Sequence, residues 1–340
     1  VMTYGFDPYL SEWSPYHGAY HAVVESLLKV AALGGNPYNA RLSFQEYFER
    51  MTSESSWGKP TMALLGAFKA QMDYKTPAIG GKDSMSGTFN DINVPPTLVS
   101  FAVTTIPVDR AVSSCLTAPR QKLYAIKLSK DDAMMYKKSN VDRVFKALNQ
   151  INDRGQLQSA SVVRGFGIAA KVAQMLMGNR LGFAFRDNLP MENLFSRSFG
   201  TILLSVNDKN AVDKIEMVGG YLLGETNATE TITWNGHLVT LADAQKAYES
   251  KLEPVFPTKT DEKPYEDKYP KLDNSTKIHK PAVLLNVKPK VFIPVFPGTN
   301  TEFDAAYAFE RAGADADVLV VKNLSPKDIS EALAEMSRRI

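Results

Sequence analysis

Residues 78–89 constrain the fold of this chain more than any other segment. A short apolar strand leads into a Gly80-Gly81 turn, and a cation, an anion and two hydroxyls follow the turn. Paired glycines let the backbone adopt positive φ angles and approach a ligand with no Cβ in between. The polar residues after them suit phosphate, ribose or metal, and they are Lys82, Asp83, Ser84 and Ser86. This order of residues predicts a phosphate or nucleotide clamp.

The same residues are compatible with a plain surface turn between two strands. The segment is not a Walker loop, because the four-residue spacer and the Gly-Lys-Ser/Thr ending are absent. Taken alone, the turn explains it equally well. The context favours ligand binding, because a second apolar strand follows directly over residues 94–103, and the two strands together predict a hairpin.

Both stretches resemble one enzyme family. Residues 80–86 read GGKDSMS and residues 95–102 read PPTLVSFA, which is similar to the second synthetase half of phosphoribosylformylglycinamidine synthase (formylglycinamide ribonucleotide amidotransferase) in its long single-chain form. The resemblance implies a ligase of purine biosynthesis that uses ATP and Mg²⁺. In that reaction the formyl amide oxygen of formylglycinamide ribonucleotide is phosphorylated to an iminophosphate, and glutamine-derived ammonia then displaces phosphate.

The resemblance also implies roles for individual residues. Gly81 is expected near a nucleotide phosphate and Ser84 near the phosphate or ribose of the substrate. Lys82 is assigned to phosphate, because related small-form enzymes have a metal-binding Asn at that place. No catalytic residue is assigned to this chain, since the other synthetase half would build most of the catalytic site.

The expected fold class is α+β. Residues 1–108 are expected to form part of an N-type subdomain of the AIR-synthetase kind, which contributes strands to a barrel shared with the other half. Residues 120–252 are expected to form a C-type α/β sandwich with a mostly antiparallel sheet, and residues 253–288 a linker rich in Pro, Lys, Asp and Thr. Residues 289–340 are expected to begin a doubly wound, class I glutaminase-like α/β domain that stops before its Cys, His and Glu.

Composition limits the classes of partner. The 340 residues are 44% hydrophobic, and 39 basic against 37 acidic residues give a formal charge of +2. This near balance gives no electrostatic reason to bind nucleic acid or membranes. The single cysteine, Cys115, excludes an internal disulfide and indicates a reducing, cytoplasmic compartment, most simply as an inert buried thiol. No apolar run reaches the length of a membrane span.

Local patterns predict most elements. Ser14-Pro15 starts a helix that Gly34-Gly35 ends, and Asn235-Gly236 joins the two strands of a hairpin over 229–240. Further helices are expected at 44–51, 59–71, 141–150, 166–177 and 210–218, and further strands at 97–106, 122–128, 181–185 and 200–206. A short apolar run at 282–287 is expected to anchor the end of the linker.

The C-terminal region predicts a strand at 290–295, an amphipathic helix ending at Ala312-Gly313, and a second strand at 317–321. The turn between strand and helix contains Pro297, Gly298 and Asn300, and it points N–H groups toward a possible anion or oxyanion site. Ordinary strand-to-helix turn chemistry, with Asn300 or Thr299 as N-cap, is the simpler interpretation. The resemblance favours the functional one.

Two departures from the family indicate a degenerate auxiliary nucleotide site. Relatives place Glu and Asn four residues apart as Mg²⁺ ligands, and here the pair is Glu25 and Lys29. An ammonium repels a metal, so we expect an i,i+4 salt bridge instead. His17 and His21 extend this stripe, which we interpret as a solvated polar face in preference to a metal site. If a metal ion were bound there, Glu25 would be its ligand.

The second departure lies before the helix at 166–177. Relatives carry HDxSDGG there, and this chain has Ser161 to Gly167 in those places. Both carboxylates of the motif are gone, and Val162 and Arg164 are among the residues that replace it. We therefore expect no Mg²⁺ and no nucleotide at this auxiliary site. We expect Arg164 to replace part of the lost order by one contact to a backbone carbonyl or a carboxylate.

Two functional classes remain open. The chain is either a fragment of the ligase that lines its synthetase cleft, inactive alone, or a non-catalytic half that serves assembly and glutaminase docking. A small-molecule kinase of the same superfamily is disfavoured by the glutaminase-like end. Without the other half, edge strands around Ala78 and Val99 are expected to pair with a second copy or another region.

Overall fold

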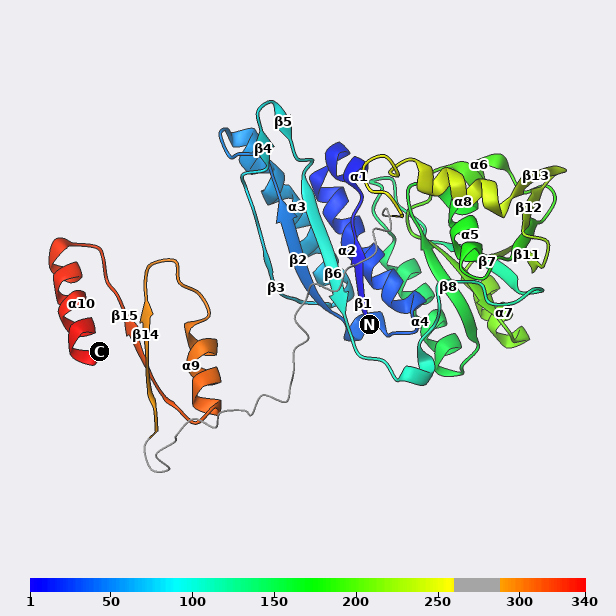
Figure 1. Cartoon of the computed structure of the whole chain (residues 1–340). Helices are drawn as coiled ribbons and strands as arrows, with labels where there is room; N and C mark the ends of the chain where they lie inside the picture. Colours follow the sequence, from blue (N-terminus) through cyan, green and yellow to red (C-terminus); the bar gives the residue numbers. More distant parts are fainter. Residues whose placement is uncertain (260–287) are drawn as a thin grey trace. The chain divides into compact units, whose positions relative to one another are not determined.

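The computed structural model describes residues 1–259 and 288–340. The chain divides into two compact units, Val1–Thr260 and Asp261–Ile340, which we describe separately (Figure 1). Most of the expected linker at 253–288, and the whole of its expected anchor at 282–287, lie outside the described residues. No helix within the described ranges is both long enough and apolar enough to cross a membrane.

The first unit begins with a four-stranded sheet in the order β1-β6-β2-β3. Its strands are β1 (Met2–Gly5), β2 (Arg41–Tyr47), β3 (Ala78–Lys82) and β6 (Thr97–Val103). Strand β6 pairs antiparallel with β1 and β2, whereas β2 and β3 run parallel. Helices α1 (Pro8–Trp13), α2 (Pro15–Ala32) and α3 (Glu54–Tyr74) accompany it, with short turns η1 (Pro37–Asn39) and η2 (Val108–Arg110). A two-stranded ribbon, β4 (Thr88–Phe89) with β5 (Ile92–Asn93), precedes β6.

Three expectations for this region are wrong. Residues 44–47 of the helix expected at 44–51 belong to strand β2 and residues 48–51 are irregular, and in β2 Leu42, Phe44 and Glu46 are buried alternately. The two strands of the expected hairpin, β3 and β6, do not pair with each other, because β2 lies between them. Val99 therefore lies on an interior strand, and the edges of this sheet are β1 and β3.

The second sheet has seven strands in the order β13-β12-β9-β11-β7-β10-β8, and only β12 and β9 pair in parallel. The strands are β7 (Lys122–Lys127), β8 (Leu157–Val163), β9 (Gly182–Phe185), β10 (Thr201–Val206), β11 (Tyr221–Asn227), β12 (Thr231–Trp234) and β13 (His237–Thr240). At the β12–β13 turn, Asn235 and Gly236 have φ of 46° and 79°, which confirms the expected hairpin.

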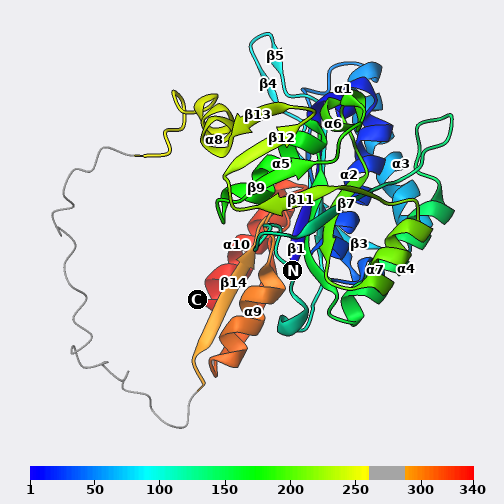
Figure 2. The same cartoon turned by 90° about the vertical axis from the view of Figure 1, so that its right-hand side faces the viewer.

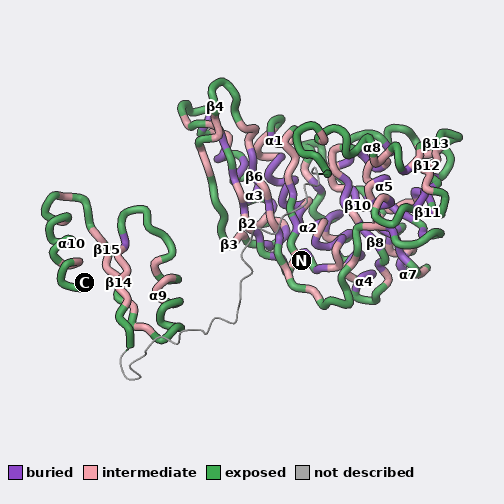
Figure 3. The backbone as a smooth tube through the Cα atoms, in the orientation of Figure 1, coloured by how far each residue is buried: buried purple, intermediate pink, exposed green. Residues whose placement is uncertain are grey.

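Helices cover both faces of this sheet (Figures 1 and 2). On one side α4 (Lys138–Asp153) and α7 (Lys209–Met217) share a core with α2, α3 and the first sheet. On the other side α5 (Gly167–Met177), α6 (Met191–Phe195) and α8 (Leu241–Ser250) build a second core. Helix α2 is buried along almost its whole length (Figure 3), because it packs against both subdomains. The fold is therefore α+β, as expected.

The second unit contains β14 (Lys290–Val295), α9 (Glu302–Arg311), β15 (Asp315–Val320) and α10 (Pro326–Arg339). Strands β14 and β15 are parallel and α9 connects them, which is the βαβ arrangement of a doubly wound domain. The expected N-cap is wrong: α9 begins after Thr301, whose φ is 67° and whose side chain makes no capping bond. The Thr299 hydroxyl instead accepts a hydrogen bond from the Phe296 N–H at 3.1 Å.

Candidate functional site

The GGKDSMS segment lies along the exposed edge of the first sheet. Gly80 has a positive φ of 155°, whereas Gly81 does not adopt a positive φ. Gly81 is needed for another reason, because a Cβ there would lie 2.2 Å from the Phe44 carbonyl oxygen of β2. The chain stays beside β2 after the glycines, since the Ser84 N–H donates to the Glu46 carbonyl at 3.0 Å. The two glycines therefore do not form the expected turn but pair closely with strand β2.

Most of the polar side chains of this segment are accessible. Lys82, Asp83 and Ser86 are exposed and Ser84 is half-buried. None of them lines the three cavities described for the first unit. Their placement at an unpaired strand edge leaves their expected role in phosphate binding a prediction.

A buried carboxyl group lies beneath this edge. Glu46 is only 7% exposed, and its carboxyl group forms no hydrogen bond or ion pair with any residue that the structure describes. Burial, and secondly the charge of Asp83, raise the pKa of Glu46 to about 7. Glu46 therefore titrates near neutrality next to the GGKDSMS segment. Sequence reasoning missed it, because it had placed this residue in a helix.

A cavity of about 700 Å³ lies in the first unit at the other edge of the sheet. Strand β1, the start of α1, the end of α2, strand β8 and the start of α5 contribute to its wall. It brings together three residues of the expected auxiliary site, Lys29, Val162 and Arg164. The fourth residue, Glu25, does not line the cavity but forms ion pairs with Lys29 and Arg164.

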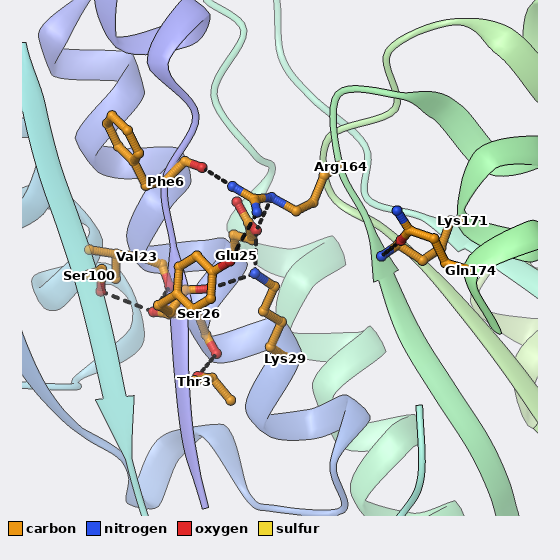
Figure 4. A network of polar contacts seen from close by, with 11 residues as sticks. Thr3, Phe6, Val23, Glu25, Ser26, Lys29, Ser100, Arg164, Lys171 and Gln174 are labelled. Carbon is orange, nitrogen blue, oxygen red and sulfur yellow. Dashed lines mark hydrogen bonds and ion pairs between the residues drawn. The ribbon is translucent and has the colours of Figure 1, made fainter. Parts of the chain in front are cut away.

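Ion pairs and hydrogen bonds join Glu25, Lys29 and Arg164 (Figure 4). Lys29 Nζ lies 2.6 Å from Glu25 Oε1, which confirms the expected i,i+4 salt bridge. Arg164 Nε lies 3.3 Å from the same oxygen, and Arg164 Nη2 donates to the Phe6 carbonyl at 2.5 Å. The ring of Tyr4 lies under both cations, 4.3 Å from Lys29 Nζ and 5.4 Å from the Arg164 guanidinium carbon. Arg164 thus links β8 to the first subdomain, and the expected contacts to a carbonyl and a carboxylate are both present.

The histidine stripe on α2 is not a solvated face, so that expectation is wrong. His21 is 5% exposed, and Met134 and Tyr136 of the second subdomain lie against it. His21 Nε2–H donates to the Met134 carbonyl at 2.9 Å, and His17 Nε2 lies 2.9 Å from the Ala133 carbonyl. Burial, and then the charge of Lys130, lower the pKa of His21 to about 4, so the ring is neutral at pH 7.

The donor set does not fit a metal ion. Across residues 1–259 and 288–340, no group of three or more His, Cys, Asp or Glu side chains is placed to hold one. Glu25 already has two cations beside it, and a third positive ion would be repelled. The weak assignment of Glu25 as a metal ligand is therefore unsupported.

Two cavity residues escaped the sequence analysis. Lys171 and Gln174 lie on α5, and Lys171 Nζ donates to Gln174 Oε1 at 2.6 Å (Figure 4). They are the only polar side chains in α5, GIAAKVAQMLM. That isolation is the signal that identifies them, because a lone Lys in an apolar helix needs a polar environment. Burial, then the charges of Lys29 and Arg164, lower the pKa of Lys171.

In the second unit the expected anion loop is exposed. Gly298 has φ of 88°, and Asn300 Nδ2 lies 3.5 Å from the Gly298 carbonyl. Pro297 and Gly298 form the turn after β14. Cys115 belongs to the first unit and is half-buried, in contrast to the buried thiol expected. Its place agrees with the expectation that it is not the glutaminase nucleophile.

Comparisons with known proteins agree with both parts of this description. The family model for the CobB/CobQ-like glutamine amidotransferase domain matches residues 288–337. Among solved structures, phosphoribosylformylglycinamidine synthase II from Thermotoga maritima is similar at 15% identity and a TM-score of 0.58, covering 72% of this chain and 44% of that one. T. maritima PurL complexed with AMPPCP gives the same four values. T. maritima PurL complexed with FGAR gives 14% identity and a TM-score of 0.57, with 72% and 45% covered.

These similarities show the fold, and they confirm the resemblance seen in the sequence at that level. The chain spans less than half the length of these T. maritima proteins. A comparison with curated proteins returned no match.

Proposed function

We propose that this chain is part of an ATP-dependent ligase that converts formylglycinamide ribonucleotide, glutamine and ATP into formylglycinamidine ribonucleotide. The observation that carries the proposal is the combination of a PurL-like fold with a glutamine amidotransferase match on one chain. T. maritima PurL has been solved with AMPPCP and with FGAR, which supports ATP and this ribonucleotide as substrates here. Ammonia from the glutaminase would be the third reactant.

In this proposal the GGKDSMS segment contributes binding. Lys82 supplies a positive charge at an exposed strand edge, where the dianionic phosphate of the ribonucleotide can reach it. Ser84 adds a hydroxyl donor, and the pairing of residues 81–87 with β2 fixes the backbone between them. Fixed donors bind an anion with little loss of conformational entropy. Catalytic groups come from the other synthetase half.

The surface of the first unit supports the proposal that another synthetase half binds to it. Among the described strands, β3 has no neighbour on its outer side, and Ile79 on it is 77% exposed. Helix α3 carries a stripe of exposed apolar residues at helical spacing, Trp57, Leu65, Phe68 and Met72. Such surfaces are typical of interfaces. The 340-residue chain alone is therefore expected to be inactive and to pair through β3, in the simplest case as a homodimer. A monomer in sedimentation at all concentrations would contradict the pairing.

Kinetics of the protein that contains this chain together with the other synthetase half test the proposal. With ammonium as nitrogen donor, K82A and S84A should each raise KM for formylglycinamide ribonucleotide by about tenfold, which corresponds to about 1.4 kcal/mol. K75A is the matched control, because Lys75 is an exposed lysine that ends α3. If neither variant changes KM or kcat, the segment does not bind substrate.

A second candidate is a non-catalytic half that serves assembly and glutaminase docking. The observation that favours it is the Glu25, Lys29 and Arg164 cluster, which lacks the ligands for Mg²⁺. We propose that this auxiliary position holds no Mg²⁺-nucleotide, which concerns this position alone. Normal ligase kinetics in both K82A and S84A, with loss of glutamine-dependent activity in a variant lacking residues 288–340, would support the second candidate over the first.

A further inference from the structure

We propose that the 700 Å³ cavity beside Arg164 binds a phosphate-bearing small molecule in its metal-free form. The cavity exists whether or not the chain acts as a ligase, so this inference does not depend on the proposed function. Its volume lies within the range of small-molecule sites.

The wall of the cavity carries a large excess of positive charge. Five basic residues line it and one acidic residue does, the basic ones being Lys29, Arg164, Lys171, Arg197 and Lys251. Glu25, which does not line the cavity, neutralises one of these positive charges through its ion pair with Lys29. Positive charge remains in excess in a partly enclosed space, where attraction for an anion is stronger than on an open surface.

Lys171 is the strongest single argument for an anion. Its ammonium is held by a neutral amide, that of Gln174 at 2.6 Å, and it forms no ion pair with any carboxylate that the structure describes. Partial burial lowers the pKa of Lys171, and the charges of Lys29 and Arg164 lower it further, while the charge of Glu25 opposes them only in part. A half-buried ammonium that forms no ion pair is unfavourable. An anion in the cavity would supply the missing counter-ion.

The start of α5 faces the same cavity. Gly165, Phe166 and Gly167 line it, and Gly167 at the first position of the helix has φ of 83°. Free N–H groups of a helix N-terminus bind phosphate oxygens, and α5 has 11 residues. Phe166 is 78% exposed, and Tyr248 on α8, also at the wall, is 61% exposed. These rings offer an apolar surface for the organic part of a ligand.

The carboxylates near the cavity are occupied, and this argues for a ligand without metal. Glu25 faces Lys29 and Arg164. Asp7 Oδ1 accepts a hydrogen bond from the Leu10 N–H at 3.0 Å and so caps α1. A divalent cation on the ligand would meet lysine and arginine side chains instead of oxygen ligands. Basic side chains thus take the place that a metal ion would fill.

Isothermal calorimetry on the 340-residue chain tests this inference, with pyrophosphate and ATP as probes, each in EDTA and in excess Mg²⁺. We expect both probes to bind in EDTA and Mg²⁺ to weaken binding at least fivefold. ATP binding tighter than pyrophosphate binding indicates that the rings contribute. K171Q should weaken binding in EDTA about tenfold and R197Q by several fold. K146Q is the control, an exposed lysine on α4 away from the cavity.

Absence of binding in EDTA would overturn the inference, and so would binding that requires Mg²⁺. Unchanged affinity in both K171Q and R197Q would overturn it too. K82A separates this inference from the proposed function: it should leave these affinities unchanged, whereas a K82A effect with no K171Q effect would assign the anion to the GGKDSMS segment. Circular dichroism and the unfolding midpoint of each variant verify that it is folded.

Discussion

Replacing Arg164 by alanine should destabilise the first unit by about 2–4 kcal/mol. The hydrogen bond from the guanidinium to the Phe6 carbonyl, at 2.5 Å, is charge-assisted and contributes about 1.5–3 kcal/mol. The ion pair with Glu25 adds less than 1 kcal/mol, roughly, because the Arg164 side chain is 33% exposed and partly screened. The stacking on Tyr4 contributes about 0.5–1 kcal/mol. Lys29 still pairs with Glu25 in the variant, so no carboxylate is left bare.

Urea unfolding followed by tryptophan fluorescence measures this loss specifically. All three tryptophans, Trp13, Trp57 and Trp234, lie in the first unit, so the signal does not report on residues 288–340. R164K keeps the charge and loses the two-nitrogen geometry, and about half of the stability should return. R143A is the matched control, since Arg143 is an exposed arginine on α4 with no polar partner among the described residues, and its change should stay within about 0.5 kcal/mol. A loss below about 0.5 kcal/mol in R164A would refute the assignment of Arg164 as the link between subdomains.

Further expectations concern pH and packing. The pKa of Glu46 is raised from 4.5 to about 7. The stability that its protonated carboxyl group contributes to the fold is therefore fully present below pH 4.5 and is lost as the pH rises through 7. E46Q should therefore gain up to about 3 kcal/mol on wild type over this range in pH-dependent urea unfolding. The pKa of His21 is lowered from 6.5 to about 4, so wild type should lose up to about 3 kcal/mol as pH falls from 6.5 to 4, while H21Q, which retains a donor for Met134, should not. In α3, G58A should stabilise by about 0.5–1 kcal/mol, because open space surrounds Gly58. G66A should cost about 2 kcal/mol or more, because its Cβ would lie 2.0 Å from the Tyr16 carbonyl oxygen, and thermal unfolding compares the pair. Equal midpoints for the two glycine variants, or parallel pH profiles for E46Q and H21Q, would contradict these arguments.

Local signals in the sequence were sufficient where capping or turn chemistry fixes the backbone. Ser14 caps α2 as expected, and Asn235-Gly236 forms the expected turn with both φ angles positive. The parallel strands β14 and β15 around α9 also follow directly from their apolar runs. In each case the information lies within a few neighbouring residues, so no knowledge of distant contacts was needed.

The incorrect prediction of a helix at 44–51 shows how a buried polar residue can mask the alternating pattern of a strand. Phe44, Phe48 and Met51 are spaced by four and three residues, which matches one face of a helix. The true period is two, with Leu42, Phe44, Glu46 and Phe48 all buried. Glu46 interrupts the apolar alternation, and its burial depends on the pairing of β2 with strands more than 30 residues away in sequence. No local pattern could supply that pairing.

The prediction that the polar stripe on α2 is solvated was wrong for a similar reason. Spacing places His17, His21, Glu25 and Lys29 on one face of the helix, and the structure agrees. Spacing does not say what covers that face. The carbonyl groups of Ala133 and Met134, more than 110 residues away, accept hydrogen bonds from the two rings, and Arg164 reaches Glu25 from β8. The chemistry of each residue was thus readable from the sequence, whereas its partner was not.

The Glu25 cluster shows how basic side chains alone can hold a partly buried carboxylate in place. A carboxylate that is 13% exposed needs a cation, and the structure provides two of them, one from the same helix and one from the other subdomain. Lys29 is bound locally, since its ammonium also donates to the Tyr4 carbonyl at 2.6 Å. Arg164 is the only one of the two that crosses between subdomains, through Phe6 and Tyr4. A guanidinium with five N–H donors can meet a carboxylate, a carbonyl and a hydroxyl at once, as a bridging metal ion would with oxygen ligands. Because it does so without recruiting further acidic residues, the cavity beside it keeps its positive charge, and the cation that holds the two subdomains together also makes their shared cavity attractive to an anion.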